Sequence, residues 1–349
     1  MRGIMRKVFA ISMIVLILAS ITGCQKENKV TLNVYNWGDY IDESVIKEFE
    51  KKYGIKVNYE MFDTNEAMYA KIKSGGVNYD VAFPSDYMIS KMIKEDMLYK
   101  IDFNNIPNYK YIDERFKNLE YDPNSEYSVP YMWGTVGILY NKKMVKDKVD
   151  SWNILWDEKY KKQIIMQDSQ RETIGVALQK LGYSVNTKNI KELEEAKREL
   201  IKQKPLVLAY VVDEVKDKMV SGEAALAVVW AGDAVAMKEE NPDLEFVVPK
   251  EGSNFFVDAM VIPKTSKHKK EAEMFINFMC EPEIAFKNTD YIKYSTPHTE
   301  ARKMLDPKVA NDPVAYPSDE VLKRCEVYKD LSDIAKEYDR IWTEIKAAK

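Results

Sequence analysis

Apolar and polar positions follow two periods along the chain, and these periods predict strands that alternate with helices. In the first third of the chain, a two-residue period indicates strands, and a helical period indicates helices that end before Gly54 and Gly75. The predicted strands are residues 31–35, 55–61 and 79–83, and the predicted helices are residues 43–53 and 65–74. This βαβαβ order predicts a parallel sheet with helices on both faces.

A second series of the same kind begins after Gly134. Its predicted strands are residues 164–166, 206–209, 225–229 and 245–248, and its predicted helices are residues 171–181, 188–203, 213–221 and 232–239. A strand at residues 255–262 follows, and the remainder of the chain to Lys349 is predicted to be helical. No internal repeat or long linker separates the two series. The pattern therefore predicts two α/β lobes joined by a hinge.

Residues 1–23 have the pattern of a bacterial lipoprotein signal peptide. Three basic side chains precede an almost wholly apolar run at residues 8–21, which is too short to span a bilayer comfortably. The run ends in Ile21-Thr22-Gly23-Cys24, which resembles the lipobox of bacterial lipoproteins. Lipid on Cys24 would hold the protein at the outer face of the cytoplasmic membrane. The alternative is a plain signal peptide with an incidental cysteine.

The charge of the chain narrows the class of ligand. The 349 residues include 52 basic and 56 acidic side chains, a net charge of −4, and removal of residues 1–23 leaves 49 basic side chains and a net charge of −7. An acidic exported protein is compatible with a cationic ligand. The basic side chains are spread along the chain, so no nucleic-acid partner is expected.

The chain offers little material for metal, disulfide or catalytic chemistry. Two histidines and three cysteines provide neither a zinc set nor a disulfide framework. Cys280 lies in an apolar run and is expected in the core, whereas Cys325 has no predicted partner. The sequence motifs of serine hydrolases, zinc proteases and nucleotide-binding enzymes are missing. We therefore expect a protein without enzymatic activity, metal or cofactor.

Aromatic and acidic residues recur together where predicted strands end. Ligands of open α/β sheets bind outside the carboxyl ends of the strands, so these positions are candidates for a binding site. The groups are Trp37, Asp39 and Tyr40; Ser85, Asp86 and Tyr87; Trp230 and Asp233; and Phe256 and Asp258. Glu172 stands in the first turn of the helix predicted at residues 171–181.

This combination suits a ligand with ammonium groups at both ends of an alkyl chain. Burying an ammonium costs several kcal/mol unless a carboxylate and hydrogen bonds replace its water. An aromatic face adds about 0.5–2 kcal/mol by cation–π attraction. Plainer explanations exist for single residues: the rings could be packing residues, Asp39 and Asp233 could be helix N-caps, and Glu172 could favour a helix dipole. Their joint occurrence favours a binding site.

At these positions the sequence resembles the spermidine/putrescine-binding family, the polyamine-binding proteins of bacterial ABC importers. The resemblance runs from about Leu32 to Ile345 and includes Tyr35-Asn36-Trp37-Gly38-Asp39-Tyr40, Asn65-Glu66-Ala67-Met68-Tyr69-Ala70-Lys71, Tyr127-Ser128-Val129-Pro130-Tyr131-Met132-Trp133-Gly134 and Ala231-Gly232-Asp233. It implies the type II periplasmic-binding-protein fold, with a ligand cleft between two hinged α/β lobes. The first lobe would span residues 29–136 and 257–302, and the second residues 137–256 and 303–349.

The resemblance also implies which residues contact the ligand. Positions of the first lobe are matched by Trp37, Asp39, Tyr40, Ser85 and Tyr87, and positions of the second lobe by Glu172, Trp230 and Asp233. Phe256 and Asp258 match an aromatic and an acid that flank an amine, and Tyr294 and Tyr328 match positions in the cleft wall.

Two departures from the family pattern concern the choice between polyamines. Where spermidine-preferring members carry an additional acid, this chain has Ser169, and the neighbouring Asp168 could replace that acid only if the loop shifts. The block Trp230-Ala231-Gly232-Asp233 resembles the putrescine-preferring type, in which the aspartate holds the terminal amine, and Phe256 replaces a tryptophan of the spermidine type. These features favour putrescine and leave spermidine open.

The sequence thus predicts a lipid-anchored, monomeric binding protein that captures putrescine or spermidine outside the cell and delivers it to an ABC permease. Hinge closure on the ligand would produce the form that the permease recognises. One alternative is a binding protein for another cation or for a sugar, because aromatic walls also stack on sugars, although a sugar would not need so many acids. Another alternative is a polyamine-sensing lipoprotein that signals without transport.

Overall fold

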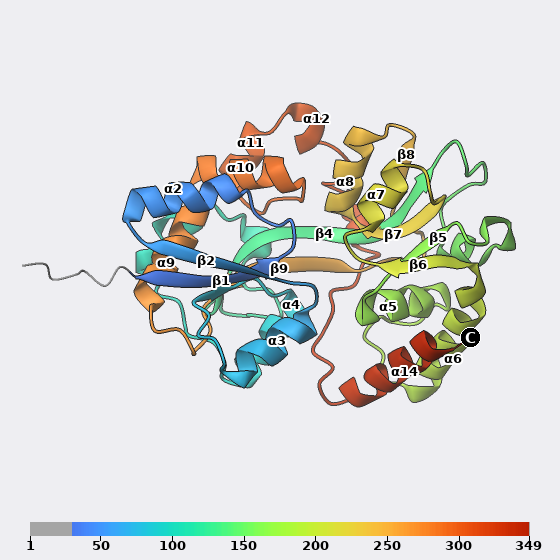
Figure 1. Cartoon of the computed structure of the whole chain (residues 1–349), viewed down its shortest axis with the longest axis horizontal. Helices are drawn as coiled ribbons and strands as arrows, with labels where there is room; N and C mark the ends of the chain where they lie inside the picture. The colour runs from blue at the N-terminus through green and yellow to red at the C-terminus, as the bar shows by residue number, and fades with distance from the viewer. Residues whose placement is uncertain (1–29, 349) are drawn as a thin grey trace, which may run out of the picture.

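The computed structural model describes residues 30–348, in which strands and helices alternate as the periodicity predicts (Figure 1). The predicted signal peptide and Cys24 lie outside the described residues. The strands are β1 Thr31–Trp37, β2 Lys56–Phe62, β3 Val81–Ala82, β4 Ser128–Asn141, β5 Ile164–Gln167, β6 Val207–Val211, β7 Leu226–Trp230, β8 Leu244–Val247 and β9 Phe255–Val261. The helices are α2 Glu43–Tyr53, α3 Asn65–Ser74, α4 Asp86–Lys94, α5 Gln170–Lys180, α6 Ile190–Gln203, α7 Val215–Val220, α8 Ala231–Glu240, α9 Lys269–Met279, α10 Pro282–Ile292, α11 Thr299–Met304, α12 Pro307–Ala310, α13 Asp319–Leu322 and α14 Ala335–Ala347.

The strands form one nine-stranded sheet with the order β2-β1-β3-β9-β4-β7-β5-β6, and β8 pairs with β4. β1 runs parallel to β2 and β3, and β5 runs parallel to β6 and β7, as the two predicted series require. β4 and β9 are antiparallel to each other and to their other neighbours, so the sheet is mixed rather than wholly parallel. In Figure 1, α2, α8 and α10 lie above the sheet, and α3, α5 and α14 lie below it.

The sequence pattern misses β4, a strand of 14 residues. Nearly all of its residues are buried, so β4 lacks the alternating polar positions that mark a half-exposed strand. Pro130 and Gly134, which are disfavoured inside strands, further weaken the strand pattern in the sequence. The first part of β4 pairs with β9 through residues 128–135, and the second part pairs with β7 through residues 136–140. β4 is therefore the strand that joins the two halves of the sheet.

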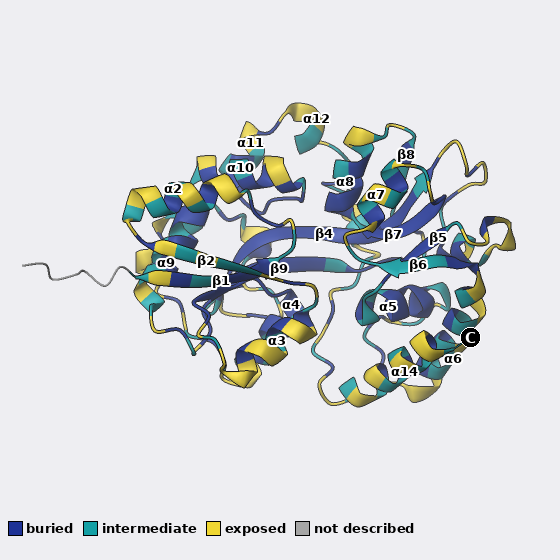
Figure 2. Cartoon of the chain, in the orientation of Figure 1, coloured by how far each residue is buried: buried dark blue, intermediate teal, exposed yellow. Residues whose placement is uncertain are grey.

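Buried side chains gather in separate cores on the two sides of this junction (Figure 2). One core uses residues between Leu32 and Trp133 together with residues between Phe256 and Tyr294. Two others use residues between Val136 and Phe246, joined by side chains from the C-terminal part of the chain. The lobe boundaries that the family resemblance implies stay a prediction.

The expectation of a wholly helical C-terminal region is wrong in part. Helices α9 to α12 follow one another, but residues 323–334, between α13 and α14, form a non-helical connecting segment that begins and ends in turns. A bridge from Asn254 to Glu326 places this segment beside the entry to β9. Backbone pairing with another part of the chain takes the place of local helical hydrogen bonds here, which a local period cannot report.

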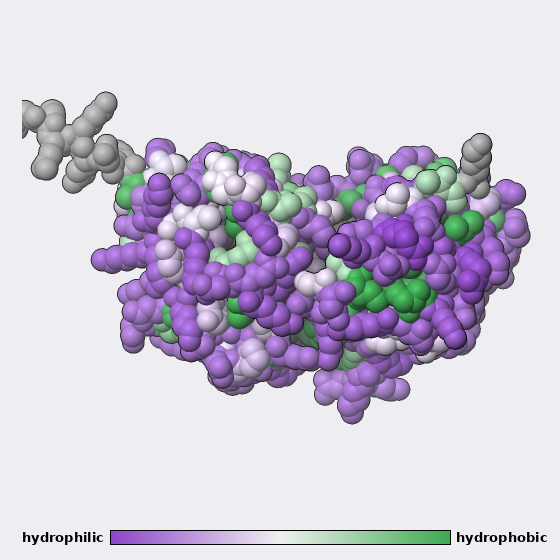
Figure 3. Space-filling model, turned by 90° about the horizontal axis from the view of Figure 1, so that it is seen from below, coloured by the Kyte–Doolittle hydropathy of each residue, from purple (hydrophilic) through white to green (hydrophobic). Residues whose placement is uncertain are grey.

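The two cysteines of the described residues are free thiols, and Cys280 is buried as predicted. None of the helices within residues 30–348 is both long enough and apolar enough to cross a bilayer. The face drawn in Figure 3 is mostly hydrophilic, and apolar side chains gather in a smaller area over the half that carries β5 and β6.

Candidate ligand-binding cavity

A cavity lies where the strands of both halves end. Its lining includes residues that follow β1, β2, β3, β5, β6 and β7, because the carboxyl ends of these strands meet there. The structure brings every one of the twelve predicted contact residues to this cavity: Trp37, Asp39, Tyr40, Ser85, Tyr87, Glu172, Trp230, Asp233, Phe256, Asp258, Tyr294 and Tyr328. Their role as ligand contacts stays a prediction.

Asp258, on β9, is held in place by hydroxyl groups on both of its oxygens. Ser85 Oγ donates to Oδ1 at 2.6 Å, and Tyr40 Oη donates to Oδ2 at 2.7 Å. Ser85 is in turn fixed by Asn65, whose Nδ2 donates to Ser85 Oγ and whose Oδ1 accepts from the Ser85 amide, each at 3.0 Å. The carboxylate of Asp258 is therefore oriented before any ligand arrives, and no basic side chain neutralises it through these bonds.

Burial makes the carboxylates of this cavity costly to ionise. Loss of solvent raises the pKa of Asp258 to about 6, although the hydrogen bonds from Ser85 and Tyr40 oppose the shift. Burial likewise raises the pKa of Asp233 to about 6, against the attraction of Lys216. Burial also raises the pKa of Asp86 to about 8 and shifts that of Glu172 upward. A cation placed among these groups would favour their charged forms.

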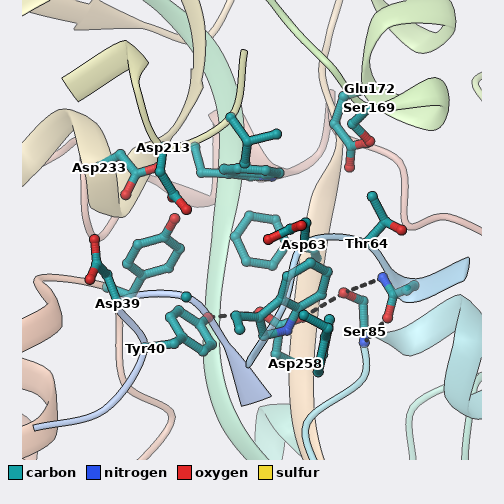
Figure 4. A pocket seen from close by; sticks show the side chains of 18 of the residues that line it. Asp39, Tyr40, Asp63, Thr64, Ser85, Ser169, Glu172, Asp213, Asp233 and Asp258 are labelled. Atoms are coloured by element: carbon teal, nitrogen blue, oxygen red, sulfur yellow. Dashed lines mark hydrogen bonds between the residues drawn. The ribbon is translucent and has the colours of Figure 1, made fainter. Parts of the chain in front are cut away.

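Asp39, Asp213 and Asp233 gather at one end of the cavity (Figure 4). Asp39 is not the N-cap of α2, because Asp42 takes that position and accepts from the Ser44 amide. Asp233 is not the N-cap of α8 either, since it lies inside the first turn and Trp230 precedes the helix. Helix capping therefore does not explain these two acids.

Glu172 and Ser169 lie at the opposite end of the cavity (Figure 4), in the first turn and at the N-cap position of α5. Ser169 Oγ donates a hydrogen bond to Glu172 Oε2. Asp168, by contrast, forms an ion pair with Lys346 and is absent from the cavity lining. The loop thus does not bring Asp168 to the place of the acid that spermidine-preferring proteins carry.

Two tyrosines close the same end of the cavity. Tyr87 Oη donates to Glu66 Oε1 at 2.9 Å, and Tyr328 belongs to the connecting segment 323–334. The guanidinium of Arg171 lies 4.3 Å from the ring centre of Tyr328 and 5.2 Å from that of Tyr87. Arg171 therefore holds rings from two distant parts of the chain by cation–π contacts.

Aromatic rings form the walls between the two acidic ends. Trp37 donates from Nε1 to the Phe83 carbonyl at 2.8 Å, so its indole is fixed while it faces the cavity. The ring of Tyr294 packs against Gly232 so closely that a Cβ there would lie 1.9 Å from Tyr294 Cδ2. The glycine of the Ala231-Gly232-Asp233 block is therefore required for this contact.

Sequence reasoning missed several lining residues. Asp63 and Asp213 follow β2 and β6, so the rule that locates sites at strand ends could have found them. Glu66 stands inside a block that carries the family resemblance, whereas Lys216 has no local signal.

Asn254 is 3 % exposed and lines the cavity, and its Oδ1 accepts no hydrogen bond within the described residues. A donor on a ligand or a water molecule would satisfy that oxygen.

The charge of the lining determines what the cavity can bind. Within residues 30–348, the lining contains eight carboxyl side chains and a single amine. The same part of the chain holds no cluster of His, Cys, Asp and Glu arranged for a metal ion. Carboxylates at both ends, aromatic walls between them and an unpaired carbonyl oxygen are the features that accommodate an extended organic cation.

Comparisons with known proteins agree with this geometry. Residues 44–317 match the profile of a family described as bacterial extracellular solute-binding protein. The spermidine/putrescine-binding periplasmic protein of Salmonella typhimurium is 39% identical over 322 residues, which cover 91% of this chain and 92% of the relative.

Two solved structures have the same fold. One is a putative spermidine/putrescine ABC transporter protein from Listeria monocytogenes, with a TM-score of 0.89 and 46% identity over 91% of this chain and 99% of that one. The other is the TpPotD lipoprotein of Treponema pallidum, with a TM-score of 0.81 and 32% identity over 90% and 99% of the two chains. The fold is that of type II periplasmic binding proteins. The chain therefore belongs to the bacterial extracellular solute-binding proteins, within the family of spermidine/putrescine-binding proteins.

Proposed function

We propose that this protein captures a polyamine, putrescine or spermidine, outside the cell and delivers it to an ABC permease. The observation that carries the proposal is the excess of carboxyl groups over amines in an aromatic-walled cavity. Its family consists of solute-binding proteins rather than enzymes. The relative from Salmonella typhimurium is called a spermidine/putrescine-binding protein, and the solved chain from Listeria monocytogenes is called a putative spermidine/putrescine ABC transporter.

We assign a role in this proposal to each part of the cavity. Asp258, oriented by Ser85 and Tyr40, would pair with one ammonium group of the ligand. Glu172 and Asp233, at opposite ends, would attract the others. The rings of Trp37 and Trp230 would cover the methylene groups, since both line the cavity between these acids.

The test is calorimetric titration of the mature protein with putrescine, spermidine, spermine, cadaverine and a panel of sugars. We expect saturable binding of the diamine and triamine and no binding of the sugars. Saturable sugar binding together with inert amines would contradict the proposal. Titrations at one fixed salt concentration keep screened, nonspecific attraction by exposed acids constant.

Delivery to a permease needs a separate test, because a sensing protein would bind the same ligand. We expect deletion of the gene to abolish uptake of radiolabelled putrescine at low external concentration, and a plasmid copy to restore it. Unchanged uptake in the deletion strain would favour a sensing role.

We also propose that Cys24 carries the lipid that anchors the protein to the membrane. The support is the lipobox pattern in the sequence and the likeness to a solved chain that is itself described as a lipoprotein. Cys24→Ala should release the protein from the membrane fraction and abolish labelling with radioactive palmitate. Retention of both label and membrane association by the variant would contradict the anchor.

A further inference from the structure

Lys216, in the first turn of α7, is the amine of the cavity lining. Its Nζ lies 3.2 Å from Asp39 Oδ2, 3.6 Å from Asp233 Oδ1 and 3.7 Å from Asp213 Oδ1. Asp39 follows β1, Asp213 follows β6 and Asp233 lies in the first turn of α8. One ammonium group therefore joins carboxylates from three segments around the acidic end of the cavity that Figure 4 displays.

Within this group of charges, the pair of Lys216 and Asp233 is shielded from water. The side chain of Asp233 is 10% exposed and that of Lys216 is 27% exposed, so water screens their attraction only weakly. Asp39 and Asp213 are 69% and 53% exposed, so their attraction to Lys216 is screened more strongly. Burial alone would lower the pKa of Lys216, but the carboxylates of Asp233, Asp213 and Asp39 outweigh it, and the net shift is upward. Lys216 is consequently a full cation at neutral pH.

The surroundings of Lys216 Nζ are those that a primary ammonium ligand requires. An ammonium has three N–H donors and needs negatively charged acceptors when it leaves water. Asp39 accepts a hydrogen bond from Nζ at 3.2 Å, and the carboxylates of Asp233 and Asp213 add negative charge at 3.6 and 3.7 Å. A ligand ammonium aimed at Asp233 would meet a position that an amine of the protein already holds.

We propose that Lys216 is a specificity-determining residue whose ammonium occupies the Asp39–Asp213–Asp233 end of the cavity until a ligand ammonium displaces it. The proposal rests on the proposed function, since it concerns the binding of polyamines in the same cavity. Lys216 offsets one negative charge there, so it weakens the binding of amines. The weakening is larger for a triamine than for a diamine, because each further ligand charge interacts with the lysine.

The main test is the affinity of Lys216→Met for putrescine and spermidine. Methionine keeps an unbranched apolar side chain and removes the charge. We expect the variant to bind putrescine about tenfold more tightly than the wild type and to gain still more for spermidine. Without ligand the variant should melt at a lower temperature than the wild type, because three carboxylates lose their counter-ion. Saturating ligand should raise the melting temperature of the variant by more than it raises that of the wild type.

Lys218 offers a matched control on the same helix. Its side chain is 28% exposed and pairs with Glu223 at 2.8 Å, and it is absent from the cavity lining. Lys218→Met should bind both amines as the wild type does. Lys216→Met that binds both amines no more tightly than the wild type would overturn the proposal.

A measurement on the wild-type protein avoids dependence on any variant. Acetic anhydride modifies exposed amines, and peptide mass spectrometry reports the modification of Lys216 relative to Lys218. Putrescine should raise the ratio of Lys216 modification to Lys218 modification, because displacement frees the Lys216 amine. A ratio that stays unchanged at saturation contradicts displacement. A wild-type protein that binds neither amine contradicts the proposed function itself, whereas normal wild-type binding with an inert Lys216 contradicts the role of this lysine alone.

Discussion

At the scale of single residues, the cavity depends on carboxylates that are buried and oriented by neutral donors. Asp258 accepts from two hydroxyl groups and is 5 % exposed. Hydroxyl groups orient a carboxylate without neutralising it, so its negative charge remains for a cationic partner. Each of the next three predictions follows from this chemistry.

Asp258→Asn should weaken the binding of every polyamine. Loss of one partner of a buried charge pair costs about 3–5 kcal/mol, or roughly two to three orders of magnitude in affinity. Asp168→Asn is the matched control, because Asp168 pairs with Lys346 outside the cavity lining. Calorimetry that places Asp258→Asn within threefold of the wild type would exclude this carboxylate from the binding site.

Binding should weaken as the pH falls through about 6. Asp258 and Asp233 each have a pKa of about 6, so they are ionised at pH 7.5 and mostly protonated at pH 5. A cationic ligand binds the ionised form, so each acid that it contacts lowers the affinity about tenfold at pH 5.

Calorimetry in two buffers of different ionisation enthalpy checks the sign of this effect. Proton release on binding near pH 6 is expected, because the ligand shifts both carboxyl groups toward their charged forms. Proton uptake, or an affinity that stays constant from pH 7.5 to 5, would mean that neither acid faces the ligand charge.

Ser169→Asp should shift the preference from putrescine toward spermidine. The new carboxylate would stand beside Glu172, at the end where Ser169 now donates a hydrogen bond to it. An added countercharge favours the ligand with the extra ammonium. Asp233→Ser should lower the affinity for putrescine more than the affinity for spermidine, because the third amine of spermidine can still use another acid such as Asp39. An unchanged affinity ratio in both variants would show that the acids at the two ends do not set ligand length.

At the scale of secondary-structure elements, the first turn of α8 is fitted to a ring from the other side of the junction. Tyr294 follows α10 and belongs to the core built around β1, whereas α8 belongs to the other half. Gly232 lets the two approach, since a Cβ would lie 1.9 Å from the Tyr294 ring.

Gly232→Ala should push α8 and Tyr294 apart. Overpacking of this kind costs about 1–3 kcal/mol in the free energy of unfolding, and it should also weaken the binding of both amines because Asp233 moves with the helix. Gly76→Ala is the control, because its nearest neighbour would be Ser74 Oγ at 3.9 Å. Thermal melting and calorimetry measure the two effects, and wild-type values for Gly232→Ala would mean that the contact is not needed for either.

At the scale of the whole molecule, few segments connect the two halves. β4 changes partner from β9 to β7 along its length, and the connecting segment 323–334 pairs with Asn254 through Glu326. Hinged proteins absorb closure in a few such connecting residues. The proposed lobes, residues 29–136 with 257–302 and 137–256 with 303–349, meet at these connections.

Addition of putrescine should reduce the radius of gyration measured by small-angle X-ray scattering. The physical reason is that acids on both sides of the cavity contact one ligand and favour the closed form. Asp258→Asn at the same ligand concentration should keep the larger radius. A radius that stays constant while calorimetry reports saturation would argue against hinge closure.

Local sequence pattern determined much of this protein. The strands and helices of both series and the acids and rings at strand ends follow from side-chain period and from the rule for parallel strands. The parallel pairing of β1 with β2 and β3 and of β5 with β6 and β7 follows in the same way, whereas β8, a strand of the second series, pairs antiparallel with β4. β4 escaped prediction because a strand buried on both faces has no polar alternation, and the segment 323–334 escaped because its partner is distant in sequence.

The tertiary structure alone decided which charges meet. Nothing local in the sequence links Lys216 to Asp39, yet they lie 3.2 Å apart because the sheet brings the ends of β1 and β6 to one cavity. The tertiary structure also decided that Asp168 pairs with Lys346, whereas Ser169 lines the cavity. Contacts between side chains distant in sequence depend on strand order and on the packing of the two halves. The hydrophobic period of a segment, by contrast, reports only which face of that segment is buried.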